Sequence, residues 1–247
     1  MSVGLFILLC WKGIPFWKQE IWAKGRPMKP GDFFRILCVF LGIQIVTSIL
    51  CTVLEFLLNR VGLSMMSVLE STGGSSDSLS MYIYASICAP IVEELLFRGY
   101  IQRTLRPYGK KFAIFCSALL FGLYHGNLIQ TPFAFMVGLV LGYVMEEYGI
   151  AWAMVLHMVN NMLVADMLTR LTSGLPELLA MGIQSLVLVG FGIAAVVVLI
   201  VKRREVAAYL RRERMNKLCL QAFFSNAGVI TMTVLMLLSI VMLITPI

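Results

Sequence analysis

The sequence has little charge. Asp, Glu, Lys and Arg together make up only 13% of its 247 residues, whereas about 25% is usual in a soluble domain. Hydrophobic residues make up 60%. This balance excludes a water-soluble protein and indicates one that lies in a lipid bilayer.

The chain also lacks a pattern of cysteines that could bind metal or form a disulfide framework. None of the six cysteines forms a C-x-x-C pair, and five of them stand in apolar runs. We therefore expect them to pack as small apolar residues. These five are Cys10, Cys38, Cys51, Cys88 and Cys116.

The apolar residues gather into runs of about 15 to 27 residues, and about 20 helical residues cross a hydrocarbon core. The candidate spans are Asp32 to Leu58, Met81 to about Arg106, Lys111 to Ile129, Thr131 to Met145, Ile150 to Thr169, Gly182 to Val201 and Phe223 to Ile244. The sequence therefore predicts an all-α fold, a polytopic transmembrane helical bundle of about seven to eight spans.

The N-terminal part is expected to differ from the rest. Its apolar stretch Gly4 to Trp11 is too short to span a bilayer and lacks a basic leader. We predict that residues 1–31 are interfacial or half-inserted and that residues 32–247 form a single transmembrane domain.

Basic residues explain the formal net charge of +7. They fall between the apolar runs, which indicates membrane topology and not nucleic-acid binding. Alternating the spans leaves only Arg60 and Arg170 on one side, opposite the N-terminal basic residues and the run Lys202 to Lys217. Because positive loops stay in the cytoplasm, the N-terminus is predicted to be cytoplasmic. This topology suggests a bacterial plasma membrane, although a eukaryotic endomembrane would leave much the same charge pattern.

Ionisable and amide side chains inside the predicted spans are costly, and they usually mark a functional interior. Three spans carry them. They are Glu93, Glu94 and Arg98 in the second span, His125 in the third, and His157, Asn160 and Asn161 in the fifth.

Helical geometry suggests how these side chains meet. Residues four apart share a helix face, whereas adjacent residues diverge by about 100°. Glu94 should therefore pair with Arg98, which leaves Glu93 pointing elsewhere, free to meet a histidine from another helix. The three helices are expected to line one polar cavity.

Such a cavity suits hydrolysis, because a carboxylate held at low dielectric can take a proton from a water that attacks a carbonyl. Glu93 is the candidate base, and His125 could hold or polarise the water. His157 and Asn161 could donate hydrogen bonds to the developing oxyanion, with Arg98 orienting Glu94. Asn161 lies four residues from His157 and shares its helix face, and Asn160, three residues away, is the alternative inward amide.

At these residues the sequence resembles the CAAX protease and bacteriocin-processing (CPBP, or Abi) family of intramembrane endopeptidases, of the type II CAAX prenyl endopeptidase kind. Three signatures occur in the family's order, within a motif core over residues 90–161. They read Glu93-Glu94-x-x-x-Arg98, Phe121-x-x-x-His125 and His157-x-x-x-Asn161.

The resemblance implies an enzyme that hydrolyses a peptide bond in a membrane-associated protein or peptide precursor, such as a CAAX-type tail, a bacteriocin or a signal peptide. Catalysis without metal is the favoured interpretation and requires no cofactor. The alternative is a zinc site made by Glu93, His125 and His157, although the H-E-x-x-H spacing is absent. The partners implied are the peptide substrate and the lipid bilayer.

Two other classes of function remain open at this point. The same fold could be a non-catalytic membrane scaffold or a bacteriocin immunity protein. A proton-coupled transporter also uses buried carboxylates and histidines, but no inverted repeat is found here. A second acidic pair, Glu146 and Glu147, lacks an arginine four residues on and is predicted to be interfacial and non-catalytic.

Overall fold

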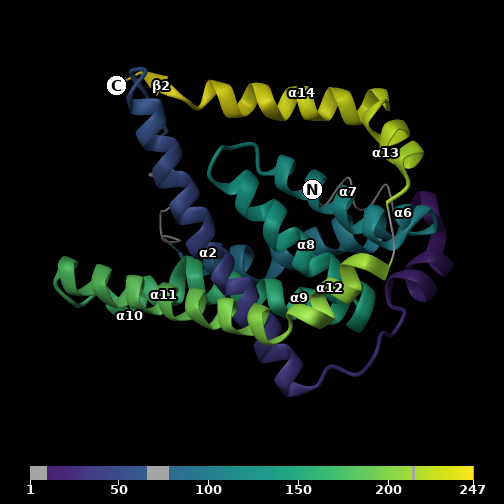
Figure 1. Ribbon diagram of the computed structural model, residues 1–247, viewed down its shortest axis with the longest axis horizontal. Coiled ribbons are helices and arrows are strands. Elements are labelled where there is room, and N and C mark those ends of the chain that lie inside the picture. The colour runs from purple at the N-terminus through teal and green to yellow at the C-terminus, as the bar shows by residue number, and fades with distance from the viewer. Residues whose placement is uncertain (1–9, 66–77, 213–214, 247) are drawn as a thin grey trace.

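The computed structural model describes residues 10–65, 78–212 and 215–246, apart from the side chains of residues 164–166. Helices account for nearly all of the regular structure, so the all-α prediction is confirmed (Figure 1). In the described part, the strands are two-residue segments, β1 (Leu63–Ser64) and β2 (Thr245–Pro246), paired antiparallel. They join the end of the first long helix to the C-terminal end of the chain.

The N-terminal segment packs against the helical bundle. Residues 10–15 are helical and continue into the π-helix η1 (Phe16–Ile21), in which Trp17 and Ile21 are buried. Most of the stretch Gly4 to Trp11 lies outside the described residues, so its interfacial placement stays a prediction.

The helix that carries the glutamate pair is continuous but irregular. It consists of α4 (Leu79–Ile83), η2 (Tyr84–Cys88), α5 (Ala89–Glu94), η3 (Leu95–Gln102), α6 (Arg103–Leu105) and η4 (Arg106–Tyr108). Ser78 caps its start by accepting a hydrogen bond from the Met81 amide. The π-helical segments η2 and η3 flank the glutamates, and π-helical turns are frequent at functional sites.

Three helices follow in the interior of the molecule (Figure 1). They are α7 (Lys110–Tyr124), α8 (Gln130–Tyr148) and α9 (Ile150–Asn160), and η5 (Asn161–Met167) and α10 (Leu168–Thr172) continue the last of them. Gly109 and Gly149, with φ of 124° and 100°, precede α7 and α9. A glycine adopts such angles without a steric penalty, which allows the chain to reverse sharply between neighbouring helices.

Long outer helices frame this interior (Figure 1). On one side α2 (Pro30–Asn59) crosses α11 (Glu177–Val201), and Gly42 of α2 meets Ala195 without room for a Cβ atom. After α12 (Arg203–Arg212), the pair α13 (Lys217–Phe224) and α14 (Ala227–Met242) lies along the opposite side.

The predicted span count of seven to eight is not confirmed. In the described residues, four helices are long and apolar enough to cross a membrane, and α13 with α14, bent by 64°, would make a fifth. The third predicted span is the 15-residue α7, which at 1.5 Å per residue reaches only about 22 Å. That length is short of a hydrocarbon core of about 30 Å.

The last predicted span, Phe223 to Ile244, is not one straight helix. It begins in α13 and crosses a break at Ser225 and Asn226. There the Asn226 side chain accepts hydrogen bonds from the amides of Gly228 and Val229 and caps α14.

Candidate functional site

A buried ion pair forms the base of the motif cluster. Arg98 Nη1 lies 3.0 Å from Glu94 Oε1, and neither side chain is exposed at all. The guanidinium carbon also lies 4.2 Å from the centre of the Phe121 ring on α7. The pairing of residues four apart, predicted from helix geometry, is confirmed.

His157 links the two adjacent glutamates. Its Nδ1 lies 2.9 Å from Glu94 Oε1, and its Nε2 lies 3.7 Å from Glu93 Oε2. Glu93 therefore diverges from Glu94 and meets a histidine of another helix, as predicted. The contact between His157 and Glu94 was not predicted, because only the tertiary structure sets the position of α9 against α5.

The hydrogen bond to Glu94 indicates which ring nitrogen of His157 carries a proton. An ionised carboxylate can only accept a hydrogen bond, so Nδ1 is the protonated nitrogen. Nε2 then faces Glu93 either as an acceptor or, in the imidazolium, as a second donor.

Phe121 holds the two histidines of the motifs in one cluster. Its ring packs edge-on against the rings of His125 and His157, with centroid distances of 4.9 and 5.8 Å. His125 follows the end of α7, and its Nδ1 lies 2.9 Å from the Phe121 carbonyl oxygen. Because that oxygen can only accept, the neutral His125 ring presents Nε2 as an acceptor.

The two asparagines are hydrogen-bonded to each other. Asn161 Nδ2 donates to the Ala85 carbonyl of η2 at 3.0 Å, and Asn160 Nδ2 donates to Asn161 Oδ1 at 3.1 Å. Asn160 is the more buried of the two. The Asn161 amide is thus fixed between α9 and the helix that carries the glutamates, with Asn160 as its support.

A second layer of polar side chains lies one to two helical turns after Arg98 along the same helix. Gln102 donates to the Gly142 carbonyl at 2.9 Å and to Glu146 at 3.3 Å, and Arg106 Nε lies 2.7 Å from Glu146 Oε2. The Glu146 side chain is only 2% exposed. The sequence did not predict that Arg106 and Gln102 cover this side chain, and the position of Glu146 at the membrane interface stays a prediction.

Glycines of α8 make room for this polar row. A Cβ atom at Gly138 would lie 3.2 Å from Arg98 Nη2, and one at Gly142 would lie 2.9 Å from Gln102 Oε1. Gly138, Gly142 and Glu146 of α8 thus face Arg98, Gln102 and Arg106 in register, each set spaced by four residues. The spacing of four residues is visible in the sequence for both sets. The sequence did not show that the two sets face each other.

The residues of the zinc alternative are only partly brought together. Glu93 meets His157, but among the described residues no three His, Cys, Asp or Glu side chains are grouped so that they could hold a metal ion. Since the donors do not form a ready site, the chemistry below uses the side chains alone.

Comparison with known proteins agrees with the motifs. Residues 75–163 match the family model described as type II CAAX prenyl endopeptidase Rce1-like. This match confirms the resemblance, and it covers the helix of the glutamate pair together with α7, α8 and α9. No curated protein and no solved structure matches the chain.

Proposed function

We propose that this chain, an integral membrane protein whose residues 75–163 match the type II CAAX prenyl endopeptidase Rce1-like family, is an intramembrane endopeptidase in which Glu93 activates water. The observation that carries the proposal is the position of His157 between two unequal glutamates. Glu94 is neutralised by Arg98 and fixes the imidazole, whereas Glu93 has no contact as tight and remains available to react.

The division of labour follows from these contacts. Glu94 has one oxygen shared by two cationic or donor groups, at 3.0 and 2.9 Å, so it orients its neighbours and does not need to exchange a proton. Glu93 is 14% exposed and lies at 3.7 Å from His157, a distance beyond a direct hydrogen bond. A water molecule can therefore approach Glu93.

In the reaction, Glu93 takes a proton from water while the water oxygen attacks the carbonyl carbon of the scissile bond. His125 Nε2 accepts a hydrogen bond from the second O–H of the water and holds the nucleophile, and this hydrogen stays on the oxygen that becomes part of the new carboxyl group. The oxyanion of the tetrahedral intermediate accepts hydrogen bonds from the Asn161 amide and from Nε2–H of the His157 imidazolium. The C–N bond then breaks, and the leaving amine takes the proton from Glu93.

The substrate class follows from the family and from the depth of the site in apolar helices. We propose a membrane-associated protein or peptide, such as a CAAX-type tail, a bacteriocin precursor or a signal peptide, in a bacterial plasma membrane with the N-terminus of the enzyme in the cytoplasm.

The experiment compares the termini of membrane-associated peptides in cells that express wild-type protein or Glu93→Ala at matched abundance. A terminus that is present with wild type and absent with the variant supports the proposal and identifies the substrate. If the variant rescues every phenotype of the null strain and no terminus differs, the chain is a non-catalytic scaffold or immunity protein instead.

A chelator tests the metal-free mechanism on the purified protein. Activity on the substrate so identified is expected to survive dialysis against a zinc chelator. Activity that disappears and returns only with added zinc would contradict the mechanism and revive the ligand set Glu93, His125 and His157.

A further inference from the structure

A cavity of about 500 Å³ lies between α2, α8, α11 and α12, apart from the motif cluster. Its volume falls within the range of about 300–1,000 Å³ that is typical of small-ligand sites. The walls are aliphatic side chains from three helices, namely Ile36, Val39, Leu139, Val140, Val198 and Leu199. Such walls suit a hydrocarbon chain.

One arginine is held in place at the edge of this cavity. Arg26 Nη2 donates to the Tyr148 hydroxyl at 2.7 Å and to the Tyr143 hydroxyl at 3.2 Å, and the guanidinium carbon lies 4.4 Å from the centre of the Tyr148 ring. The Arg26 amide also donates to the Glu147 carbonyl at 2.8 Å. The side chain is nevertheless 53% exposed, so a fixed cation faces outward.

Two more cations and two acids share the rim. Arg35 pairs with Asp32 at 3.1 Å and Lys202 pairs with Glu205 at 2.6 Å, each with a neighbour three residues away. The Arg26 guanidinium meets Glu147 at 3.7 Å. Exposed ion pairs of this kind contribute little stability, and a phosphate group can replace a carboxylate in them.

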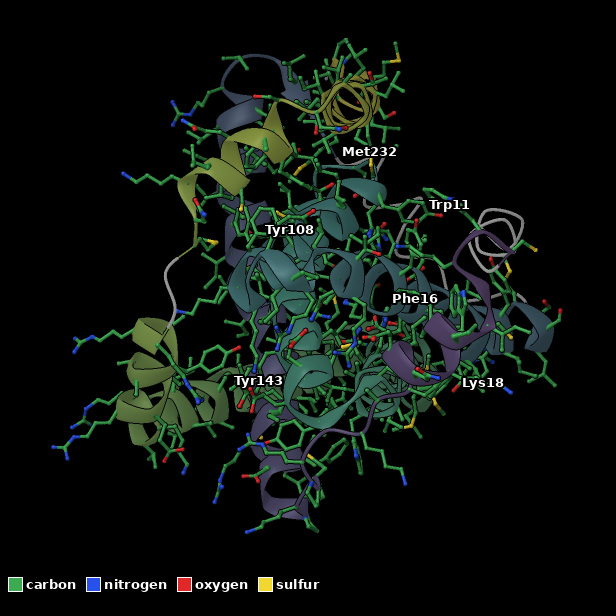
Figure 2. All side chains as sticks on the ribbon, turned by 90° about the vertical axis from the view of Figure 1, so that its right-hand side faces the viewer. Trp11, Phe16, Lys18, Tyr108, Tyr143 and Met232 are labelled. Atoms are coloured by element: carbon green, nitrogen blue, oxygen red, sulfur yellow. The ribbon has the colours of Figure 1, made fainter. Side chains whose placement is uncertain are left out.

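Basic residues continue beyond the rim. The helix α12 carries Arg203, Arg204, Arg211 and Arg212 against the single acid Glu205. Its Tyr209 ring packs edge-on against Tyr143 at 5.1 Å, which places the basic helix over the cavity. Figure 2 shows Tyr143 on the side of the bundle that faces this helix.

We propose that this cavity binds an anionic phospholipid, with an acyl chain between α2, α8 and α11 and the phosphate at Arg26, Arg35 and Lys202. Aliphatic walls and a cationic rim occur together at the ends of two membrane-spanning helices, α2 and α11. Basic pockets between such helices are sites for acidic lipid headgroups. The site is independent of the proposed peptidase activity.

Native mass spectrometry of the purified full-length chain tests the proposal, with phosphatidylglycerol and phosphatidylcholine of identical acyl chains as probes. Wild type is expected to bind phosphatidylglycerol roughly tenfold more tightly, because both lipids carry the phosphate but the choline cation of phosphatidylcholine neutralises it and is repelled by the basic rim. Arg26→Gln should remove most of that preference. Arg60→Gln, at the other end of α2, is the matched control and should leave it unchanged.

A second variant tests the apolar half of the site. Val140→Phe fills the cavity and should weaken the binding of both lipids, while its thermal unfolding shows whether the fold is intact. Equal affinity for the two lipids in wild type, or a preference unchanged in Arg26→Gln, would overturn the proposal. Binding of glycerol phosphate as tight as that of the whole lipid would also overturn it, because the cavity would then not be used.

Discussion

At the scale of single residues, the adjacent glutamates are expected to differ: substitution of Glu93 should reduce activity, and substitution of Glu94 should reduce stability. Glu93→Gln removes the proposed base, whose ion pair with His157 is long, at 3.7 Å. We expect the rate of peptide cleavage to fall by about 10²–10⁴-fold, the usual contribution of a general base, with the thermal unfolding temperature nearly unchanged. Cleavage that persists in this variant would exclude Glu93 as the base.

Glu94→Ala should mainly lower the stability of the fold. The guanidinium of Arg98, which has no exposed surface, would lose its carboxylate partner at 3.0 Å. Breaking a buried pair in this way costs about 3–5 kcal/mol. Thermal unfolding in detergent is therefore expected to shift strongly downward, and an unfolding temperature equal to that of Glu93→Gln would contradict the assigned difference between the two residues.

The asparagine pair tests which amide serves the site. Asn161→Ala removes the bond to Ala85 and the proposed oxyanion donor together, whereas Asn160→Ala removes only the support of Asn161. Loss of one oxyanion donor usually costs about 10²–10³-fold in turnover, so we expect Asn161→Ala to fall in that range and Asn160→Ala to lose less. The measurement is turnover at saturating substrate, and the reverse order would assign the donor role to Asn160.

At the scale of elements, the contact between α8 and the helix of residues 79–108 depends on two glycines. Gly142→Ala would place a Cβ atom 2.9 Å from Gln102 Oε1 and from Ile114. Overpacking of this kind typically costs about 1–3 kcal/mol. Gly182→Ala in α11 is the control, because nothing lies within 4 Å of its Cβ position and alanine favours a helix by about 1 kcal/mol. Denaturant unfolding should therefore rank the two variants on opposite sides of wild type.

The neighbouring glutamates at the end of α8 allow a similar comparison. Glu146→Ala leaves Arg106 and Gln102 without their shared acceptor, whereas Glu147, 22% exposed, meets Arg26 only at 3.7 Å. We expect Glu146→Ala to lower the free energy of unfolding by about 1.5–3 kcal/mol, the usual contribution of a hydrogen bond to a charged group, and Glu147→Ala to lower it by less than about 1 kcal/mol. Equal effects would show that the buried layer under Arg98 does not hold the helices in register.

At the scale of the whole molecule, the charge distribution predicts which ends of the helices face the cytoplasm. An epitope inserted between Arg203 and Arg212 should be accessible to antibody only after permeabilisation. One inserted after Gly62, whose surroundings are open, should be accessible in intact cells, because the charge pattern predicts that the loop with Arg60 lies on the opposite side. Staining of intact cells that carry the first insertion would show that the predicted topology is wrong.

The sequence by itself determined the helical membrane character and the set of motif residues. Little charge, long apolar runs and ionisable side chains within them are properties of composition and order. The pairing of Glu94 with Arg98 also followed from the sequence, because two residues four apart on one helix meet whatever surrounds that helix.

Only the tertiary structure decided how the helices meet, because contacts between distant segments depend on packing that no local pattern encodes. It placed His157 between Glu93 and Glu94 and buried Glu146 under Arg106. It also put α7 and α8 in the interior, where 15 residues suffice for a helix that neighbouring helices cover. Hydropathy shows that such a segment is apolar, but it cannot show whether lipid or protein surrounds the segment.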